Sequence, residues 1–256
     1  MADDVRDFYQ QLARDYHLIY ADWNKAIERQ GNALDRLIRA YGDGAPCDVL
    51  DCSCGIGTQA IGLAERGYRV HATDVSPAAV ERATDEARAR DLPISFGVAD
   101  MRCLDKQVEG EFDIVLSCDN ALPHLLTDDD LQAAVCSMRS RLRASGMLLI
   151  SIRDYDHLIM EKPPATTPRV FDDDNGRRIV FQVWDWAERT YTVNMFILRE
   201  SKKGWLTAHY VTTYRALLRA ELGALLDECG FTDVRWYMPQ DTGYFQPVVI
   251  ARRGKA

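Results

Sequence analysis

The stretch from Val49 to Gln59 constrains the fold more than any other part of this chain. It reads Val-Leu-Asp-Cys-Ser-Cys-Gly-Ile-Gly-Thr-Gln, an apolar run that ends in an acid and leads directly into a Gly-x-Gly turn. A helical apolar pattern then begins at Ala60. Strand, glycine turn and helix in this order predict a ligand-binding loop, because Gly55 and Gly57 allow sharp turning and close backbone approach. The N-terminus of the following helix directs backbone N–H groups at that ligand.

The residues around this turn narrow the kind of ligand. No lysine follows, as a phosphate-binding loop requires, whereas alanine at position 60 is tolerated in dinucleotide-binding turns. Asp51 stands directly before the turn, where a carboxylate repels a pyrophosphate but suits a cationic amino group. Asp74 ends the next apolar strand, where doubly wound folds hold a ribose diol. The two acids together predict a nucleoside that carries a cationic arm.

Further elements follow in a fixed order over residues 47 to 153. They are the segment Gly97-Val-Ala-Asp100-Met101, the strand-like run 112–120, and the Ser145-Gly146 turn before the apolar run 147–152. With the glycine turn and the Asp74 strand, this set resembles the class I S-adenosylmethionine-dependent methyltransferases. The resemblance implies S-adenosyl-L-methionine as cofactor and S-adenosyl-L-homocysteine as product.

The resemblance also implies which residues surround the cofactor. Asp74 is expected at the ribose, Asp100 at the adenine amino group, and Met101 over the adenine ring. Arg29 precedes Asp51 by 22 residues, similar to the offset of an arginine that binds the cofactor carboxylate in related glycine methyltransferases. The full set expected at the cofactor is Tyr16, Trp23, Arg29, Asp51, Cys54, Gly55, Gly57, Asp74, Asp100, Met101 and Cys118.

Three motifs are similar to those of glycine N-methyltransferase and the glycine/sarcosine N-methyltransferases. Cys54-Gly-Ile-Gly57 resembles Ala-Cys-Gly-Thr-Gly, Asn120-Ala-Leu-Pro-His124-Leu125 resembles Gly-Asn-Ser-Phe-Ala-His-Leu, and Ile152-Arg-Asp-Tyr-Asp-His-Leu158 resembles His-Arg-Asn-Tyr-Asp-His-Ile. The similarity implies that Arg153 binds a substrate carboxylate and that Asn120 helps to hold it. Two residues depart from the pattern and leave the acceptor open, since Asp119 replaces glycine and Pro123 replaces alanine.

The expected substrate site follows from these motifs. Its residues are Arg153, Asn120, Tyr155, His157 and Tyr20, and the catalytic group is Arg153, Asn120 and His124. A planar guanidinium suits a carboxylate bidentately, although a surface salt bridge with Asp154 or Asp156 is the alternative for Arg153. A histidine in a loop after a strand is more often a hydrogen-bonded positioner than a base, so both roles stay open for His124.

Composition excludes several classes of partner. The chain has 256 residues and a formal charge of −8, which disfavours nucleic acid because phosphate binding requires a basic face. It contains no 18-residue apolar run, and its acidic start lacks the features of a signal peptide. Seven scattered cysteines without a Cys-x-x-Cys pair predict free thiols in a reducing cytoplasm and no metal site.

The pattern along the chain predicts an α/β protein with a doubly wound, Rossmann-like, mostly parallel seven-stranded sheet. Residues 1–45 are expected to form a helical lid with a break at Gly31 and Asn32. Residues 46–154 and 216–256 are expected to form the cofactor domain, because strands and helices alternate there. Residues 155–215 are expected to form an antiparallel insertion that covers the active site.

The resulting hypothesis is a methyltransferase acting on the amino nitrogen of glycine, sarcosine or a similar small amino acid, by in-line displacement. The alternatives are an O-methyltransferase acting on a carboxylate, phosphonate or natural-product hydroxyl, a non-catalytic cofactor-binding module, and an oxidoreductase. Asp51 disfavours the oxidoreductase, and the presence of the binding acids disfavours the module. The partner is expected to be a small molecule, and the sequence leaves the oligomeric state open.

Overall fold

The main element of the structure is a seven-stranded sheet with the strand order β10-β11-β5-β4-β1-β2-β3. This computed structural model describes residues 2–42, 47–173 and 176–254. The first five strands pair in parallel, and they are β1 (Asp48–Asp51), β2 (Arg69–Asp74), β3 (Ser95–Val98), β4 (Phe112–Ser117) and β5 (Leu142–Ser151). The two antiparallel strands are β10 (Phe231–Tyr237) and β11 (Val248–Arg253). The predicted mostly parallel α/β sheet is confirmed.

Both faces of the sheet are buried, which explains the continuous apolar runs in the sequence. Successive side chains of a strand point to opposite faces. In β4, Ile114 and Leu116 join one hydrophobic core, whereas Val115 joins the other. Helices α2 (Trp23–Tyr41) and α3 (Thr58–Ala64) contribute to the first core, and α6 (Asp128–Ser140) and α8 (Arg219–Glu228) to the second. Four further helices connect the strands of this sheet: α4 (Pro77–Arg88), α5 (Leu104–Gln107), η2 (Leu122–His124) and α9 (Pro239–Thr242).

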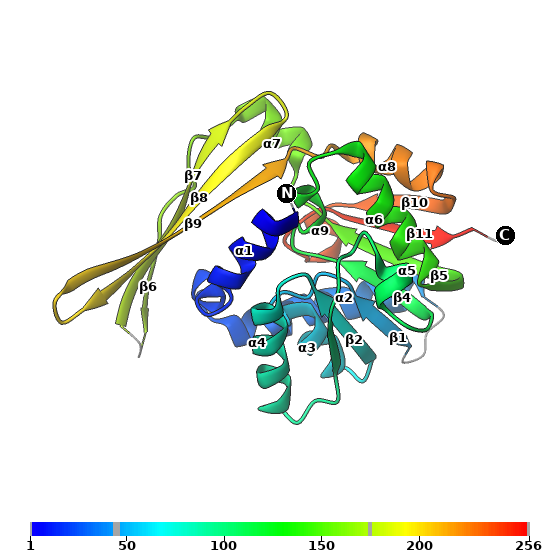
Figure 1. Cartoon of the computed structure of the whole chain (residues 1–256), viewed down its shortest axis with the longest axis horizontal. Helices are drawn as coiled ribbons and strands as arrows, with labels where there is room; N and C mark the ends of the chain where they lie inside the picture. Colours follow the sequence, from blue (N-terminus) through cyan, green and yellow to red (C-terminus); the bar gives the residue numbers. More distant parts are fainter. Residues whose placement is uncertain (1, 43–46, 174–175, 255–256) are drawn as a thin grey trace.

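A second sheet is inserted between β5 and α8. Its four antiparallel strands are β6 (Arg169–Asp173), β7 (Gly176–Trp186), β8 (Thr190–Ser201) and β9 (Gly204–Arg215), and α7 (Tyr155–Glu161) leads into it. Figure 1 shows this sheet in yellow-green beside the main domain, with α1 (Ala2–Leu12) in dark blue between the two. The insertion therefore contacts the N-terminal segment. The predicted antiparallel sheet is present. The predicted domain boundaries remain a proposal, and the one between residues 45 and 46 lies outside the described residues.

The predicted helix break at Gly31 and Asn32 is wrong, because α2 continues through both residues. The interruption lies earlier, where the short helix η1 (Tyr16–Ile19) separates α1 from α2, and Asp22 caps α2 by accepting the Lys25 N–H at 3.1 Å. Glycine at position 31 allows α2 to pack closely on α3. A Cβ placed there would lie 2.8 Å from the Gly62 carbonyl oxygen of α3. The glycine thus marks a close helix contact rather than a helix end.

The expectation of seven free thiols is also wrong. Cys136 of α6 and Cys229, directly after α8, form a disulfide with a Cα separation of 5.6 Å. Their 93-residue separation explains why spacing alone gave no sign of the pair. Two of the seven cysteines therefore no longer support a reducing compartment. The other five are free thiols.

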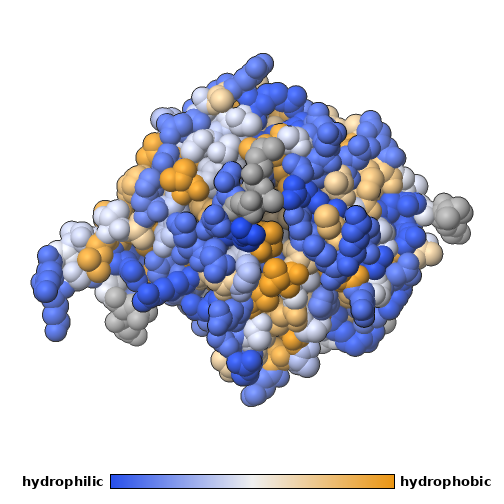
Figure 2. Space-filling model, in the orientation of Figure 1, coloured by the Kyte–Doolittle hydropathy of each residue, from blue (hydrophilic) through white to orange (hydrophobic). Residues whose placement is uncertain are grey.

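The surface on the face of Figure 1 is mostly hydrophilic. Figure 2 shows its hydrophobic side chains in several groups that hydrophilic residues separate. Among the described residues, no helix has the length and apolar character needed to cross a membrane.

The contact between α2 and α3 generates a stability prediction. A Cβ at Gly62 would lie 2.8 Å from the Ile27 carbonyl oxygen and 3.0 Å from the Gly31 Cα, so the backbones must separate in Gly62→Ala. We expect this variant to lose roughly 1–3 kcal/mol of unfolding free energy in urea titrations. The control is Gly223→Ala in α8, where the nearest atom to a new Cβ is 4.0 Å away and alanine should stabilise by about 0.5–1 kcal/mol. Equal effects at the two positions would contradict this account of the packing.

Candidate active site

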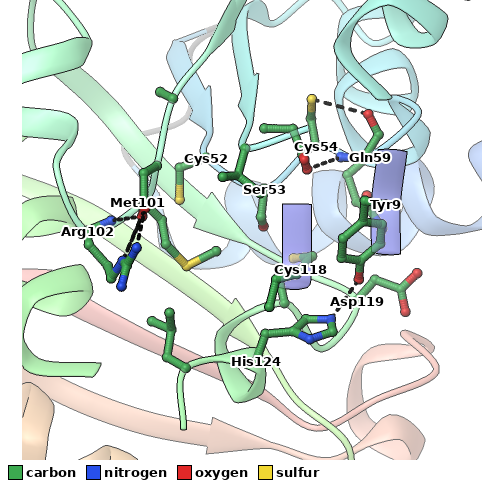
Figure 3. Close-up of a pocket in the computed structure, with 18 of the residues that line it drawn as sticks. Tyr9, Cys52, Ser53, Cys54, Gln59, Met101, Arg102, Cys118, Asp119 and His124 are labelled. Atoms are coloured by element: carbon green, nitrogen blue, oxygen red, sulfur yellow. Dashed lines mark hydrogen bonds and ion pairs between the residues drawn. The ribbon is translucent and has the colours of Figure 1, made fainter. Parts of the chain in front are cut away.

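A cavity of about 890 Å³, counted out to its open mouth, lies at the carboxyl ends of the parallel strands. Residues that follow β1, β2, β3 and β4 line it, together with Val5, Tyr9 and Tyr16 of the N-terminal segment (Figure 3). This is the edge at which ligands of open α/β sheets bind.

The glycine turn is tied to the end of β2 by Asp74. The Asp74 carboxylate accepts the Gly55 N–H at 2.8 Å and the Ser76 N–H at 2.9 Å. Burial raises the pKa of this carboxyl group. Gly55 has a φ of +52°, and a Cβ there would lie 3.4 Å from the Tyr16 ring, so glycine keeps this wall of the cavity open. Asp74 and Gly55 both line the cavity, as does Cys54.

Asp51 lies beneath the turn rather than in the cavity wall. It is 1% exposed, and its Oδ1 accepts the Ser53 N–H at 3.3 Å. Its Oδ2 is buried and has no hydrogen-bond partner among the described residues. Burial raises the pKa of this group to about 8. The observed contact of Asp51 is therefore with the backbone of the glycine loop.

The wall formed after β3 contains the predicted residues Asp100 and Met101. Arg102, which the sequence analysis missed, also lines the cavity and pairs with Asp100 at 2.6 Å and with Asp130 at 2.5 Å. Burial favours a higher pKa for Asp100, but its bonds with Arg102 outweigh burial and hold the pKa below the ordinary value. This carboxylate is therefore ionised and fixed at neutral pH.

Asn120 connects the end of β4 to the segment after β5. Its Oδ1 accepts the Arg153 backbone N–H at 3.0 Å and the Tyr155 hydroxyl at 3.0 Å. Asn120 is 2% exposed, and its Nδ2 has no hydrogen-bond partner in the described part of the chain. The amide is oriented by these two donors, which leaves its own buried donor available to a ligand.

The Arg153 guanidinium lies among aromatic side chains. It donates to the Tyr191 hydroxyl at 2.6 Å and lies 5.2 Å from the Trp184 ring centroid and 5.0 Å from that of Tyr214. Cation–π contacts of this kind hold a guanidinium in place. The aromatic residues of the insertion therefore form the wall around Arg153.

The alternative surface salt bridge of Arg153 is not formed. Asp154 and Asp156 pair instead with Arg219, at 2.5 and 3.4 Å. Within residues 2–42, 47–173 and 176–254, the Arg153 guanidinium has no carboxylate within ion-pair distance.

His124 is neutral, and hydroxyl groups hold both of its ring nitrogens. Its Nε2 is 3.0 Å from the Tyr9 hydroxyl and its Nδ1 is 3.3 Å from the Thr212 hydroxyl, so both ring nitrogens are engaged. Its ring lies 4.1 Å from that of Tyr214. Burial, and next the charge of Arg153, lower its pKa to about 3. These contacts favour the positioning role over the base role, and Figure 3 shows Tyr9 and His124 directed toward each other.

Asp119 is the chief residue that the sequence analysis did not assign to the site. It lines the cavity, and its Oδ2 accepts the Tyr16 hydroxyl at 3.3 Å and the Tyr20 hydroxyl at 3.1 Å. Gln246 donates to its Oδ1 at 3.4 Å. Burial raises the pKa of Asp119 to about 6. The signal in the sequence was the departure from the glycine of the related motif.

Two predicted site residues do not reach the site. Arg29 lies exposed on α2, next to the buried Gln30, because the face of α2 that packs on α3 carries Gln30 instead. The side chain of His157 is 64% exposed on α7 and lies 3.3 Å from Glu161, one helical turn away. Neither residue lines the cavity, and their predicted contacts with the cofactor and the substrate stay predictions.

The remaining predicted residues occupy intermediate positions. Tyr16 and Cys118 line the cavity, whereas Gly57 begins α3 with a φ of +93°. Trp23 does not line the cavity, but its indole N–H donates at 2.9 Å to the hydroxyl of Thr58, which does. The described residues include no group of three or more side chains arranged to hold a metal ion.

Comparison with known proteins agrees with this geometry. The Methyltransferase domain family matches residues 49–146. A glycine/sarcosine N-methyltransferase of Parasynechococcus marenigrum is 35% identical over 54% of this chain and 48% of that protein, so the chain spans about half of its length. A glycine/sarcosine N-methyltransferase of Aphanothece halophytica is 24% identical over 88% of this chain and 80% of that protein.

Solved structures share the fold at low sequence identity. A sugar N-methyltransferase from Streptoalloteichus is similar with a TM-score of 0.77 and 18% identity, covering 94% of this chain and 93% of that one. An amino pentose methyltransferase from Micromonospora echinaspora, solved with bound S-adenosylmethionine, has a TM-score of 0.72 and 20% identity, covering 89% and 91% of the two chains.

The fold, the cavity at the strand ends and these matches agree with one another: residues 49–146 match the Methyltransferase domain family, and the fold is shared with a solved S-adenosylmethionine-dependent methyltransferase from Clostridium acetobutylicum. Over the matched regions the chain is similar to glycine/sarcosine N-methyltransferases.

The environment of Asp51 generates a prediction about stability and pH. Its pKa in the folded state is about 8, well above the ordinary 3.8, so the folded state retains a proton that the unfolded state loses. As pH rises from 4 to 8, the wild type should lose stability relative to Asp51→Asn, by at least about 1 kcal/mol, the equivalent of one pKa unit. Urea unfolding without cofactor at several pH values measures this difference. A difference that does not change with pH would contradict the prediction, and Asp91→Asn at an exposed position is the control.

Proposed function

We propose that the protein transfers a methyl group from S-adenosylmethionine to the amino nitrogen of glycine, sarcosine or a similar small amino acid. The observation that carries this proposal is the Arg153 guanidinium, which is held among Tyr191, Trp184 and Tyr214 without a carboxylate partner in the described chain. A partly buried guanidinium is stabilised by a carboxylate that matches its planar donors. An acceptor with a carboxylate supplies that group.

The cofactor cavity contains polar groups that fit S-adenosylmethionine. Asp74 would hold the ribose, Asp100 and Met101 would contact the adenine, and Gly55 would allow close approach of the amino-acid arm. The support for this assignment is that all four line one cavity and that a Cβ at Gly55 would press on Tyr16.

The acceptor would lie beside this cavity. Asn120, with an unpartnered buried Nδ2, and Arg153 would hold its carboxylate, and Tyr155 would fix the orientation of Asn120. Tyr20 would line the same region through its bond to Asp119. The residues around the acceptor thus come from the N-terminal segment, the end of β4 and the segment after β5.

The bound cofactor supplies a methyl group that its sulfonium already activates for displacement. The residues of this chain therefore act mainly by holding the nucleophile in line with that methyl group and by excluding water. His124 would act by fixing Tyr9 and Tyr214 rather than by taking a proton, since its nitrogens are engaged and its pKa is about 3.

The second candidate is O-methylation of a small carboxylate, phosphonate or hydroxyl compound. The observation that favours it is Asp119, an acid at the position of the glycine in the related motif, since a carboxylate is able to accept a hydroxyl proton. The absence of a carboxylate partner for Arg153 fits both classes of acceptor.

The experiment that tests the function has two stages. Titration calorimetry with S-adenosylmethionine measures cofactor binding, and release of S-adenosylhomocysteine is then measured with glycine, sarcosine, dimethylglycine and a panel of hydroxy and phosphonic acids. Turnover of an amino acid supports the proposal. Turnover of oxygen nucleophiles alone would replace it by the second candidate, and failure to bind the cofactor would overturn both.

Substitution of Arg153 tests the acceptor assignment. Arg153→Ala should raise the KM of a carboxylate-bearing acceptor about 10- to 100-fold, because a hydrogen bond between charged groups contributes roughly 1.5–3 kcal/mol. The dissociation constant of S-adenosylmethionine should change little. Arg219→Ala is the matched control, because it removes the guanidinium that pairs with Asp154 and Asp156 beside the same motif. An equal rise in KM in both variants would indicate a structural role for Arg153.

A further inference from the structure

Two opposite charges, Asp119 in the cavity wall and Arg153 close enough to act on its pKa, form no ion pair with each other. Asp119 accepts hydrogen bonds only from neutral groups, and Arg153 donates to a tyrosine hydroxyl. No ion pair joins either side chain to another residue in the described ranges. Both are partly buried, and the two charges are near enough to interact, since Arg153 stabilises the ionised form of Asp119. Removing unpaired charges from water is unfavourable unless a ligand supplies the missing partners.

The carboxylate of Asp119 is held in place by distant parts of the chain. Tyr16 and Tyr20 of the N-terminal segment donate to one oxygen, and Gln246, just before β11, donates to the other. Asp119 also lines the cofactor cavity, and Figure 3 places it beside Cys118 and below the Tyr9 ring. A side chain fixed from three directions at the junction of two sites is positioned for contact with a ligand.

The backbone at this position is unfavourable for an acid. Asp119 has a φ of +58° and Asn120 a φ of +67°, so two consecutive residues other than glycine adopt left-handed conformations. Such residues are each strained by about 1–3 kcal/mol, and this strain is concentrated at functional sites. Glycine, which occupies the position of Asp119 in the related motif, relieves the strain. The carboxylate is therefore retained against a backbone preference.

We infer that Asp119 binds the ammonium end of a zwitterionic acceptor whose carboxylate is held by Arg153, and that Asp119 receives the proton that this nitrogen loses before methyl transfer. This inference rests on the proposed function. One N–H bond breaks and the proton moves to a carboxylate oxygen of Asp119, which leaves the electron pair on nitrogen. That pair forms the bond to the methyl carbon while the electrons of the carbon–sulfur bond return to sulfur. No oxidant or reductant is required.

The surroundings of Asp119 are compatible with this role. The groups that face it are Tyr16, Tyr20, Gln246 and Arg153, and its charge also acts on Tyr9, Tyr214 and Tyr244. The tyrosines have pKa values raised above their ordinary value, so they remain neutral donors across the working range. The pKa of Asp119 is raised by burial to about 6, so the carboxylate is ionised at neutral pH yet a better proton acceptor than an exposed aspartate.

The test compares the wild type with Asp119→Asn and Asp119→Gly. Asparagine still accepts the tyrosine hydroxyls and tolerates a left-handed backbone, and glycine removes the strain, so neither variant should fail to fold. We expect kcat/KM for glycine or sarcosine to fall about 100-fold in both variants. In the wild type, kcat/KM should fall as pH drops through about 6, because the carboxylate then takes up a proton, and this limb should disappear in Asp119→Asn.

A binding experiment separates ammonium recognition from carboxylate recognition. With S-adenosylhomocysteine present, Asp119→Asn should bind glycine more weakly than the wild type does, while acetate, which has the carboxylate but no ammonium, should bind equally or more tightly. The matched control is Asp91→Asn, since Asp91 is exposed and also has a left-handed φ, of +53°. This control should leave every measurement unchanged.

The outcomes distinguish this inference from the proposed function. If the wild type methylates an amino acid and Asp119→Asn retains its kcat/KM and its acid limb, Asp119 has no role at the ammonium, and the function stands. If Asp119→Asn loses affinity for S-adenosylmethionine while the KM of the acceptor is unchanged, the carboxylate serves the cofactor, and the inference is overturned. If the wild type methylates no amine, the proposed function and the inference both fail.

Discussion

The hydrogen bond from the Gly55 N–H to the Asp74 carboxylate is the interaction on which the site depends. It joins the turn after β1 to the end of β2 and is reinforced by the Ser76 N–H on the other oxygen. Parallel strands place their carboxyl ends at one edge, but they do not fix the loops that follow. A carboxylate that accepts backbone donors from both loops fixes this wall of the cavity before any ligand arrives. Because Asp74 is buried, the tie is not weakened by competing solvent.

The acceptor side is assembled by contacts between distant segments. Arg178 of the inserted sheet donates to the backbone carbonyls of Leu18 and Tyr20 at 3.1 and 2.9 Å, and Tyr210 donates to Asp15 at 2.8 Å. These bonds hold the N-terminal segment against the insertion, and this placement brings the hydroxyls of Tyr16 and Tyr20 to Asp119. The insertion therefore shapes the site in two ways, by surrounding Arg153 with aromatic rings and by fixing the segment that holds the opposite charge.

Much of the fold was predictable from local patterns, whereas the site was predictable only in part. The buried strands, the glycine turn and the antiparallel insertion each leave a signal within a few residues, and the acids at the strand ends follow from topology. Contacts between distant segments leave no such signal, which is why the Cys136–Cys229 disulfide was missed. Arg29 does not line the cavity, and its offset along the chain could not predict this because an offset does not specify which face of a helix is buried. Asp119 was visible only as a departure from a family motif, and its role depends on partners up to 127 residues away.

The groups around Asp119 have two opposing effects on the pKa of its carboxyl group. Burial disfavours its charged form, while the Tyr16, Tyr20 and Gln246 donors and the charge of Arg153 favour it. Without these donors and the charge of Arg153, the pKa of Asp119 would be higher, and a smaller fraction of the group would carry a negative charge. With stronger donors, such as a second arginine in place of the tyrosine hydroxyls, it would be too acidic to take up a proton. In the role that we propose for Asp119, neutral hydroxyl donors in a partly buried site meet both requirements, which fits the presence of tyrosines from the N-terminal segment, rather than a cation, as the partners of this acid.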